Sequence, residues 1–210
     1  MSWGRGNDAP AGASASVTRL PALPTASDAD ILAALAARRP AGGAALYDRY
    51  RRLVRRILLR LLGAHNDLND LIQETFVAVI RTIGRVTGPE ALRPWITSVA
   101  VFTARDELRR RRRKRFLVFL ADDVHDIEAP FAPPEAKEAL RAMYRILSAL
   151  PADERIAFAL RFIEGMELTE VATACRVSLA TIKRRVARAK STFEAQAGHH
   201  PSLAPWLEGW

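Results

Sequence analysis

Basic side chains are the densest chemical feature of this sequence. Seven stand in a row at Arg109–Arg115, and five more lie between Leu179 and Thr192, a stretch that contains no acidic residue. Over the whole chain, 32 Lys and Arg against 23 Asp and Glu give a formal charge of +9. Such clusters hold phosphate oxygens, so they favour a polyanionic partner: a nucleic acid, an anionic membrane or an acidic protein.

The residues that could carry catalysis or hold a metal form no recognisable site. The histidines show no ligand spacing with Cys175 or with a carboxylate, and no glycine-rich phosphate loop is present. Cys175 is the single cysteine, so an intramolecular disulfide is excluded and a reducing compartment fits best. Its ordinary interpretation is a small buried hydrophobe. We therefore predict no enzyme activity, no metal and no cofactor.

The composition is that of a soluble globular protein, with 49% hydrophobic and 26% charged residues in 210. The longest apolar runs are far shorter than the ~18 residues that a membrane span requires. The first residues contain no apolar segment typical of a signal peptide. We expect a cytoplasmic protein with no membrane partner.

Helical periodicity begins after an N-terminal segment of small residues. Ser27 is a suitable N-cap for a first helix, which the segment at 38–43 is expected to end. From Ala44, apolar residues recur at helical spacing up to Gly63, a suitable C-cap. The inward face of this second helix is expected to consist of Leu46, Tyr50, Leu53, Val54, Ile57 and Leu61.

Two further helices follow in the first half. Asn66 or Asp67 can cap the third, and the fourth is expected to begin near Pro94 and to carry the arginine run at its end. Their inward faces are predicted to be Leu68, Leu71, Ile72, Phe76, Val79 and Ile83, then Trp95, Val99, Phe102 and Leu108. No segment alternates with period two, so we predict an all-α protein.

An acidic, proline-rich segment, "ADDVHDIEAPFAPPE", separates two helical blocks and indicates a flexible linker between two small domains. We predict five parts: a disordered N-terminal arm at 1–26, a first domain at 27–116, the linker at 117–136, a second domain at 137–196 and a C-terminal tail at 197–210. In the tail, Trp206 and Trp210 either pack on the second domain or a partner, or belong to a disordered end.

The second domain contains the pattern of a helix-turn-helix. An apolar face is followed by the short segment "RVS" at 176–178 and then by a second apolar stripe, Ile182, Val186, Ala189 and Phe193. With that stripe buried, the cations of the second helix must project from its other faces, where they can meet DNA; they are Lys183, Arg184, Arg185, Arg188 and Lys190. A merely solvated charged face is the alternative.

Motifs in both domains together resemble a known family. The first domain carries "DLIQETF", "RPWITSVA" and "ARDELRRRR", and the second carries "LSALPADERIAFALRFIEGMELTEVATACRVSLATIKRRVARAK". In order and spacing they are similar to the extracytoplasmic-function group of bacterial sigma factors, within the sigma-70 family. The resemblance covers about residues 28–196. It implies a sigma region 2 helical bundle, a sigma region 4 helix-turn-helix, and promoter-specific transcription initiation.

The resemblance implies a polymerase-binding surface in the first domain. In that family, the helix with the first motif docks on the beta-prime subunit through acidic and amide side chains. The corresponding residues lie at i, i+3, i+4 and i+7 and form a stripe distinct from the core face: Asp70, Gln73, Glu74 and Val77. A solvated polar face is the alternative interpretation.

The family also melts and holds the promoter's minus-ten element with the segment around "RPWITSVA" and the helix that follows. The cations that could grip the single strand here are Arg93, Arg105, Arg109 and Arg110. Trp95 either packs in the core or touches DNA. Phe102 stands where the family often has asparagine, so hydrogen-bonded readout from that position is lost. Arg111–Arg115 extend past the family pattern, and we expect from them a sequence-independent grip on phosphate.

Recognition of the minus-35 element is implied for the helix-turn-helix. We assign it to Arg176, Ser178, Thr181, Lys183, Arg184 and Arg188. Three positions depart from the family's usual residues: Arg176 and Ala180 replace glycine, and Glu167 replaces a capping serine or threonine. If Arg176 adopts a left-handed conformation, the cost is about 1 kcal/mol.

The implied partners are core RNA polymerase, through its beta-prime and beta subunits, and promoter DNA. The sequence leaves open whether an anti-sigma protein also binds. The acidic linker either runs near the RNA exit path, as in the family, or is a solvated loop. The alternative function is a helix-turn-helix transcriptional regulator with a helical protein-interaction domain.

Overall fold

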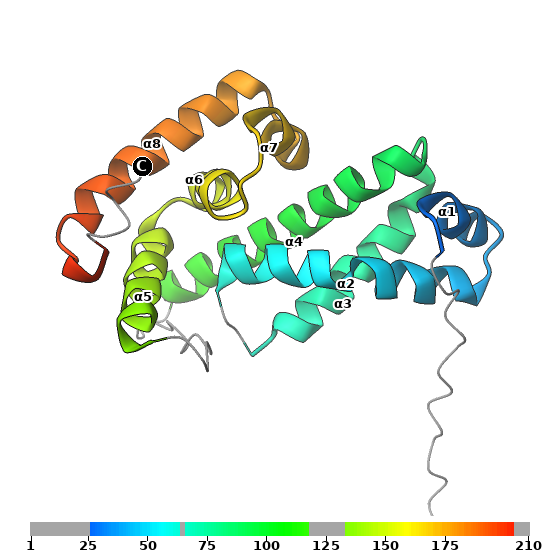
Figure 1. The fold of residues 1–210 in the computed structure, drawn as a ribbon, viewed down its shortest axis with the longest axis horizontal. Helices are drawn as coiled ribbons and strands as arrows, with labels where there is room; N and C mark the ends of the chain where they lie inside the picture. The colour runs from blue at the N-terminus through cyan, green and yellow to red at the C-terminus, as the bar shows by residue number, and fades with distance from the viewer. Residues whose placement is uncertain (1–25, 64–65, 118–132, 204–210) are drawn as a thin grey trace, which may run out of the picture.

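The computed structural model describes residues 26–63, 66–117 and 133–203. Within these ranges every regular element is helical and no strand occurs, so the predicted all-α class is confirmed (Figure 1). Most of the predicted arm and linker, and both tail tryptophans, lie outside the described residues.

The first half contains four α-helices and one short 3-10 turn. Their bounds are α1 (Asp28–Ala36), α2 (Pro40–Leu62), α3 (Leu68–Thr82), η1 (Ile83–Arg85) and α4 (Pro89–Leu117). The second half contains α5 (Pro134–Ala149), α6 (Ala152–Phe158), the π-helical turn η2 (Ala159–Ile163), α7 (Leu168–Cys175), α8 (Leu179–Ala197) and the 3-10 turn η3 (Pro201–Leu203).

The predicted cap of the first helix is present. The Ser27 hydroxyl accepts from the Asp30 backbone N–H at 3.2 Å, and the Asp30 carboxylate accepts from the Ser27 backbone N–H at 3.0 Å. Each side chain satisfies a donor that the helix itself leaves free. The helix is fixed to α2 by the Tyr50 hydroxyl, which donates to Asp28 at 2.7 Å, and by the burial of Ile31.

Two predicted helix starts are wrong, and proline explains both. The second helix begins at Pro40 rather than Ala44, because proline at the first helical position fixes φ and lacks only a donor that is unpaired there. The fourth helix begins at Pro89, so that Pro94 lies inside it. Pro89 already supplies the favourable start, and Pro94 interrupts one hydrogen bond on an exposed face.

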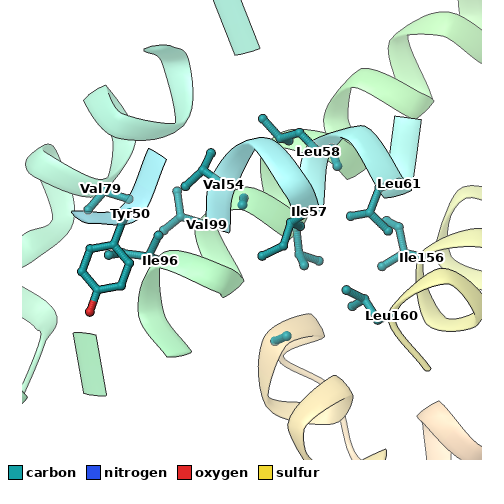
Figure 2. Close-up of a cluster of buried hydrophobic side chains, with 14 of the residues drawn as sticks. Tyr50, Val54, Ile57, Leu58, Leu61, Val79, Ile96, Val99, Ile156 and Leu160 are labelled. Carbon is teal, nitrogen blue, oxygen red and sulfur yellow. The ribbon is translucent and has the colours of Figure 1, made fainter. Parts of the chain in front are cut away.

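The core of the first half lies between α2, α3 and α4, which pack on one another. Figure 2 shows Val54 of α2 beside Ile96 and Val99 of α4. The same core continues past Leu61 to Ile156 and Leu160 of the second half (Figure 2). Apolar burial therefore joins the two halves of the chain.

The second half lies against one side of α4. Figure 1 shows α4 extending along the molecule, with α6 and α7 lying over it and α8 beyond them. A second apolar cluster holds α5, α6 and α8 together, and in it the Phe158 ring lies 4.8 Å from the Phe193 ring. Trp95 and Phe102, predicted to point into the core of the first half, are only half-buried and face this second half.

Gly42→Ala is expected to destabilise the fold. An added Cβ would lie 2.9 Å from the Leu35 backbone nitrogen, at the close approach of α1 and α2. Overpacking against backbone costs about 1–3 kcal/mol, more than alanine returns in helix propensity. Gly84→Ala is the control, since nothing lies within 4 Å of its added Cβ. Urea unfolding measures both; equal stability of the two variants would contradict the close approach.

Candidate nucleic-acid interface

The second half contains the predicted helix-turn-helix, formed by α7 and α8. Arg176 adopts the left-handed conformation at the end of α7, with φ 52° and ψ 49°. The Ser178 hydroxyl accepts from the Thr181 backbone N–H at 3.2 Å and so caps α8. At the start of α7, the Glu170 carboxylate accepts from the Glu167 backbone N–H at 2.8 Å. Glu170 thus provides a cap although Glu167 has replaced the usual serine or threonine.

The five predicted cations of α8 differ in their surroundings, and Lys190 lies 3.6 Å from Glu194 on the same helix. Lys183 and Arg184 are exposed. Arg185 and Arg188 instead turn toward α6, where Arg185 lies 2.9 Å from Asp153 and Arg188 lies 2.8 Å from Glu154. The predicted basic face is thus only partly free in this arrangement.

Arg176 joins the helix-turn-helix to α4. Its guanidinium carbon lies 4.5 Å from the centre of the Trp95 ring and 5.0 Å from that of Phe102, within cation–π range. Its Nε donates to the Ser98 hydroxyl at 3.0 Å, and Ser98 donates to the Ala174 carbonyl at 3.1 Å. The strained turn residue is therefore stabilised by the first half of the chain.

The cations predicted to grip the minus-ten element lie in different surroundings. Arg105 is buried, and its Nε lies 2.9 Å from the Asp153 carboxylate of α6. Arg109 is more exposed, and its Nη2 lies 3.9 Å from Asp153. Arg93 is exposed and lines a cleft of about 570 Å³ between α2, α4, α7 and the segment before α7.

Glu107 organises the start of the arginine run. Its side chain is only 4% exposed, and Arg110 and Arg111 both donate to it at 2.7 Å. Burial alone would raise the pKa of Glu107, but the hydrogen bonds and positive charges of the two arginines lower it below the usual range. Arg110 and Arg111, which we predicted to differ in role, therefore share one structural partner.

The four residues of the predicted polymerase-binding stripe lie together on α3. Asp70, Gln73, Glu74 and Val77 are all exposed. Two further exposed apolar side chains, Ile80 of α3 and Tyr47 of α2, extend the stripe, and the Tyr47 ring lies 4.9 Å from the buried Phe76 ring. The stripe therefore has a polar N-terminal half and an apolar C-terminal half.

Sequence reasoning missed the acidic residues that hold these cations. Asp153 lies in the first turn of α6, two residues after Pro151, where an acidic residue usually serves the helix dipole. Glu164 lies 2.7 Å from Arg56 and also pairs with Arg60, both on α2. Their partners are far away in the sequence, so no spacing rule could have found them.

The search for a metal site and for a membrane-spanning helix was limited to the described part of the chain. There, no three or more His, Cys, Asp or Glu side chains are grouped so that they could hold a metal ion. Within the same ranges, no helix is both long and apolar enough to span a bilayer. Cys175 is buried, and burial raises its pKa to about 11, so the predicted interpretation as a small buried residue is confirmed.

Comparison with protein families gives two matches, one in each half. The model of sigma-70 region 2 matches residues 46–114, and that of sigma-70 region 4 matches residues 140–193. The chain belongs to the sigma-70 family. As a sigma factor, it directs RNA polymerase to promoters, and its relatives place it in the extracytoplasmic-function (ECF) group.

Two of these ECF relatives each match about two thirds of the chain or more. The chain is 28% identical to the ECF RNA polymerase sigma-E factor of Haemophilus influenzae over 159 residues, which are 71% of this chain and 84% of the relative. It is 29% identical to the ECF RNA polymerase sigma factor SigX of Bacillus subtilis over 144 residues, which are 66% of this chain and 74% of SigX.

Two solved structures share the fold of this sigma factor. CnrH, solved in complex with the cytosolic domain of CnrY, matches with a TM-score of 0.57 and 20% identity over 82% of this chain and 98% of CnrH. The sigma factor RpoE of Bartonella quintana, solved with the anti-sigma factor NepR, matches with a TM-score of 0.54 and 22% identity over 72% of this chain and 98% of RpoE.

Glu107→Gln is expected to reduce the loss of stability in acid. The folded-state pKa of Glu107 is lowered, so its contribution is present above the ordinary value and is lost as the pH falls through the folded value. The melting temperature should therefore differ between wild type and variant at about pH 7, and the difference should disappear as the pH falls through the lowered pKa of the folded state. Glu138→Gln, an exposed site on α5, is the control. A difference in melting temperature between wild type and Glu107→Gln that does not change with pH would contradict the role of Glu107.

Proposed function

We propose that this sigma factor binds core RNA polymerase through the α3 stripe, holds the minus-ten element with α4, and reads the minus-35 element with α8. It acts through binding alone, without covalent chemistry. The observation that supports this best is the pairing of both sigma-70 regions in one chain with an exposed stripe on α3.

The polymerase surface is proposed from exposure and chemistry. Asp70 and Glu74 lie one turn apart and offer carboxylates to basic side chains of a partner. Val77 is 46% exposed and Ile80 is 44% exposed, unusually high for apolar residues on a helix whose other face is fully packed. An apolar patch beside a charged one is typical of a protein-binding surface. We therefore add Ile80 and Tyr47 to the proposed surface.

The nucleic-acid surfaces are proposed on α4 and α8. Exposed Arg93 and Arg109, with Arg105 and Arg110 beside them, would follow the backbone of the single strand at the minus-ten element. At the minus-35 element, Lys183 would contact phosphate and Arg184 would reach base edges. The remaining minus-35 contacts are proposed for Arg176, Ser178, Thr181 and Arg188.

Run-off transcription with purified core polymerase tests the function. We expect promoter-specific transcripts only when this chain is added to core polymerase. If no such transcript forms, and the chain does not co-elute with core, the sigma function is excluded. If the chain then still binds specific duplex DNA by itself, the alternative of a helix-turn-helix regulator is favoured.

Asp70→Ala combined with Glu74→Ala should abolish co-elution with core polymerase in gel filtration. Both side chains are exposed, so the fold should survive, which circular dichroism checks. The matched control is Glu135→Ala with Glu138→Ala, two exposed carboxylates on α5. Core binding by the α3 variant at the level of the control would show that the stripe is not the docking surface.

Arg184→Ala should weaken binding to a minus-35 duplex by ~1 to 3 kcal/mol if the side chain contacts a base. Arg184 is exposed, so its loss should not alter folding. Arg141→Ala, which removes the same charge from an exposed position on α5, is the control. Fluorescence anisotropy of labelled duplexes measures the effect, and unchanged affinity would show that α8 does not read the element through Arg184.

An anti-sigma protein is a further proposed partner. The likeness to RpoE, which was solved with the anti-sigma factor NepR, supports it. The cleft between α2, α4 and α7 offers charged and apolar groups to such a partner. Purification of the tagged chain from its native cells, with mass spectrometry of bound proteins, tests the proposal. Recovery of polymerase subunits alone would contradict it.

A further inference from the structure

We propose that Leu179 reads a thymine of the minus-35 element through an apolar contact with the C5-methyl group of that base. The inference rests on the proposed function, because it concerns the helix assigned to the minus-35 element. The side chains assigned to that element so far are polar or charged. Leu179 adds an apolar contact, and this contact determines which base is preferred at one position of the element.

Leu179 is an exposed leucine in the helix-turn-helix. Four large apolar side chains are exposed among the described residues, and three of them, Tyr47, Val77 and Ile80, belong to the surface proposed for the polymerase. Leu179 is the fourth, 37% exposed, and it lies on α8 of the other half. Exposed apolar atoms gain free energy when a partner covers them. A partner for Leu179 is therefore expected at the helix-turn-helix itself.

The position of Leu179 in α8 is the one that comes nearest to the bases. Leu179 is the first residue of α8, whose N-terminal end lies beside α7 (Figure 1). The cap formed by Ser178 and the Thr181 backbone N–H, at 3.2 Å, fixes this first turn. In a helix-turn-helix, the second helix enters the major groove and its N-terminal residues contact base edges. Leu179 is therefore held on a rigid turn that faces the groove.

Two cations and a small side chain accompany Leu179 in the first two turns of α8. Lys183 lies four residues further on, on the same side of the helix as Leu179, and Arg184 follows it; both are exposed. Ala180 is also exposed and places only a methyl group next to Leu179. The positive charges attract the phosphates on either side of the groove, while Ala180 leaves the leucine free to approach the base edges. An apolar contact flanked by cations thus suits the major groove of DNA.

The chemistry of leucine selects thymine among the four bases. Its side chain has no hydrogen-bonding atom, so it distinguishes bases only by shape and polarity. Thymine presents a C5-methyl group in the major groove, whereas the other bases present amino groups, ring nitrogens or carbonyl oxygens there. Against those groups, leucine would displace water without replacing its hydrogen bonds. The preferred partner of Leu179 is therefore the methyl group of thymine.

Selection of duplexes from a random-sequence library tests the preference, with holoenzyme assembled from the full-length chain and core polymerase. Wild type should select a thymine that Leu179→Ala replaces by any base, while the other selected positions stay the same. Leu179→Met keeps a large apolar side chain and should keep the thymine. Leu179 is exposed, so both variants should fold, which thermal melting by circular dichroism checks. Selection of the same bases by Leu179→Ala and wild type overturns the proposal.

Replacement of thymine by uracil tests the methyl group itself, because uracil pairs identically and lacks only that group. In the selected duplex, uracil at the critical position should weaken binding of the wild-type holoenzyme about fourfold, as expected when one methyl group leaves an apolar contact. The same replacement should not change binding by Leu179→Ala. Uracil at the other selected thymines is the control and should affect both proteins equally. An equal effect on both proteins at every thymine overturns the contact.

The selection also separates this inference from the function on which it rests. If the wild-type holoenzyme selects no common sequence, the proposed function is refuted, and the role of Leu179 with it. If a common sequence is selected but contains no thymine that depends on Leu179, only the role of Leu179 is refuted. The minus-35 assignment of α8 then stands on its cations alone.

Discussion

Arg105 lies in the middle of α4 with its guanidinium buried, and a buried charge is tolerated only beside an opposite one. Asp153 supplies that charge from the start of α6. The pair therefore requires α6 to lie over α4. With α6 in this place, the following α7 also packs on α4, and Arg176 at its end meets Trp95. The relative position of the two halves is thus linked to this ion pair as well as to the apolar core that continues from one half into the other.

The helices of the first half could be predicted from the sequence because each buries one stripe of apolar residues. Ile57 and Leu61 of α2 and Phe76 and Val79 of α3 are buried as their spacing indicates. Helix starts were less predictable, since a proline such as Pro94 favours the first turn but is also tolerated further in on an exposed face. The all-α class could thus be read from periodicity, whereas two boundaries depended on local backbone geometry.

The residues of the proposed sites could likewise be predicted from the sequence only in part. The alignment of Asp70, Glu74 and Val77 follows from helix geometry alone, and the structure has them exposed on one face of α3. Which cations are free does not follow from helix geometry, because Arg105 and Arg185 find their carboxylate in an element distant in sequence. A basic run read as exposed can therefore contain members that are already paired. Trp95 and Phe102 are similar cases, because the surface they face belongs to the other half of the chain.

The length of α4 has a mechanical consequence. At 29 residues and 1.5 Å per residue, the helix is about 43 Å long, and it packs on α2 and α3 as well as on α6 and α7. The same helix therefore belongs to the core of the first half and also supports α6 and α7 of the second half.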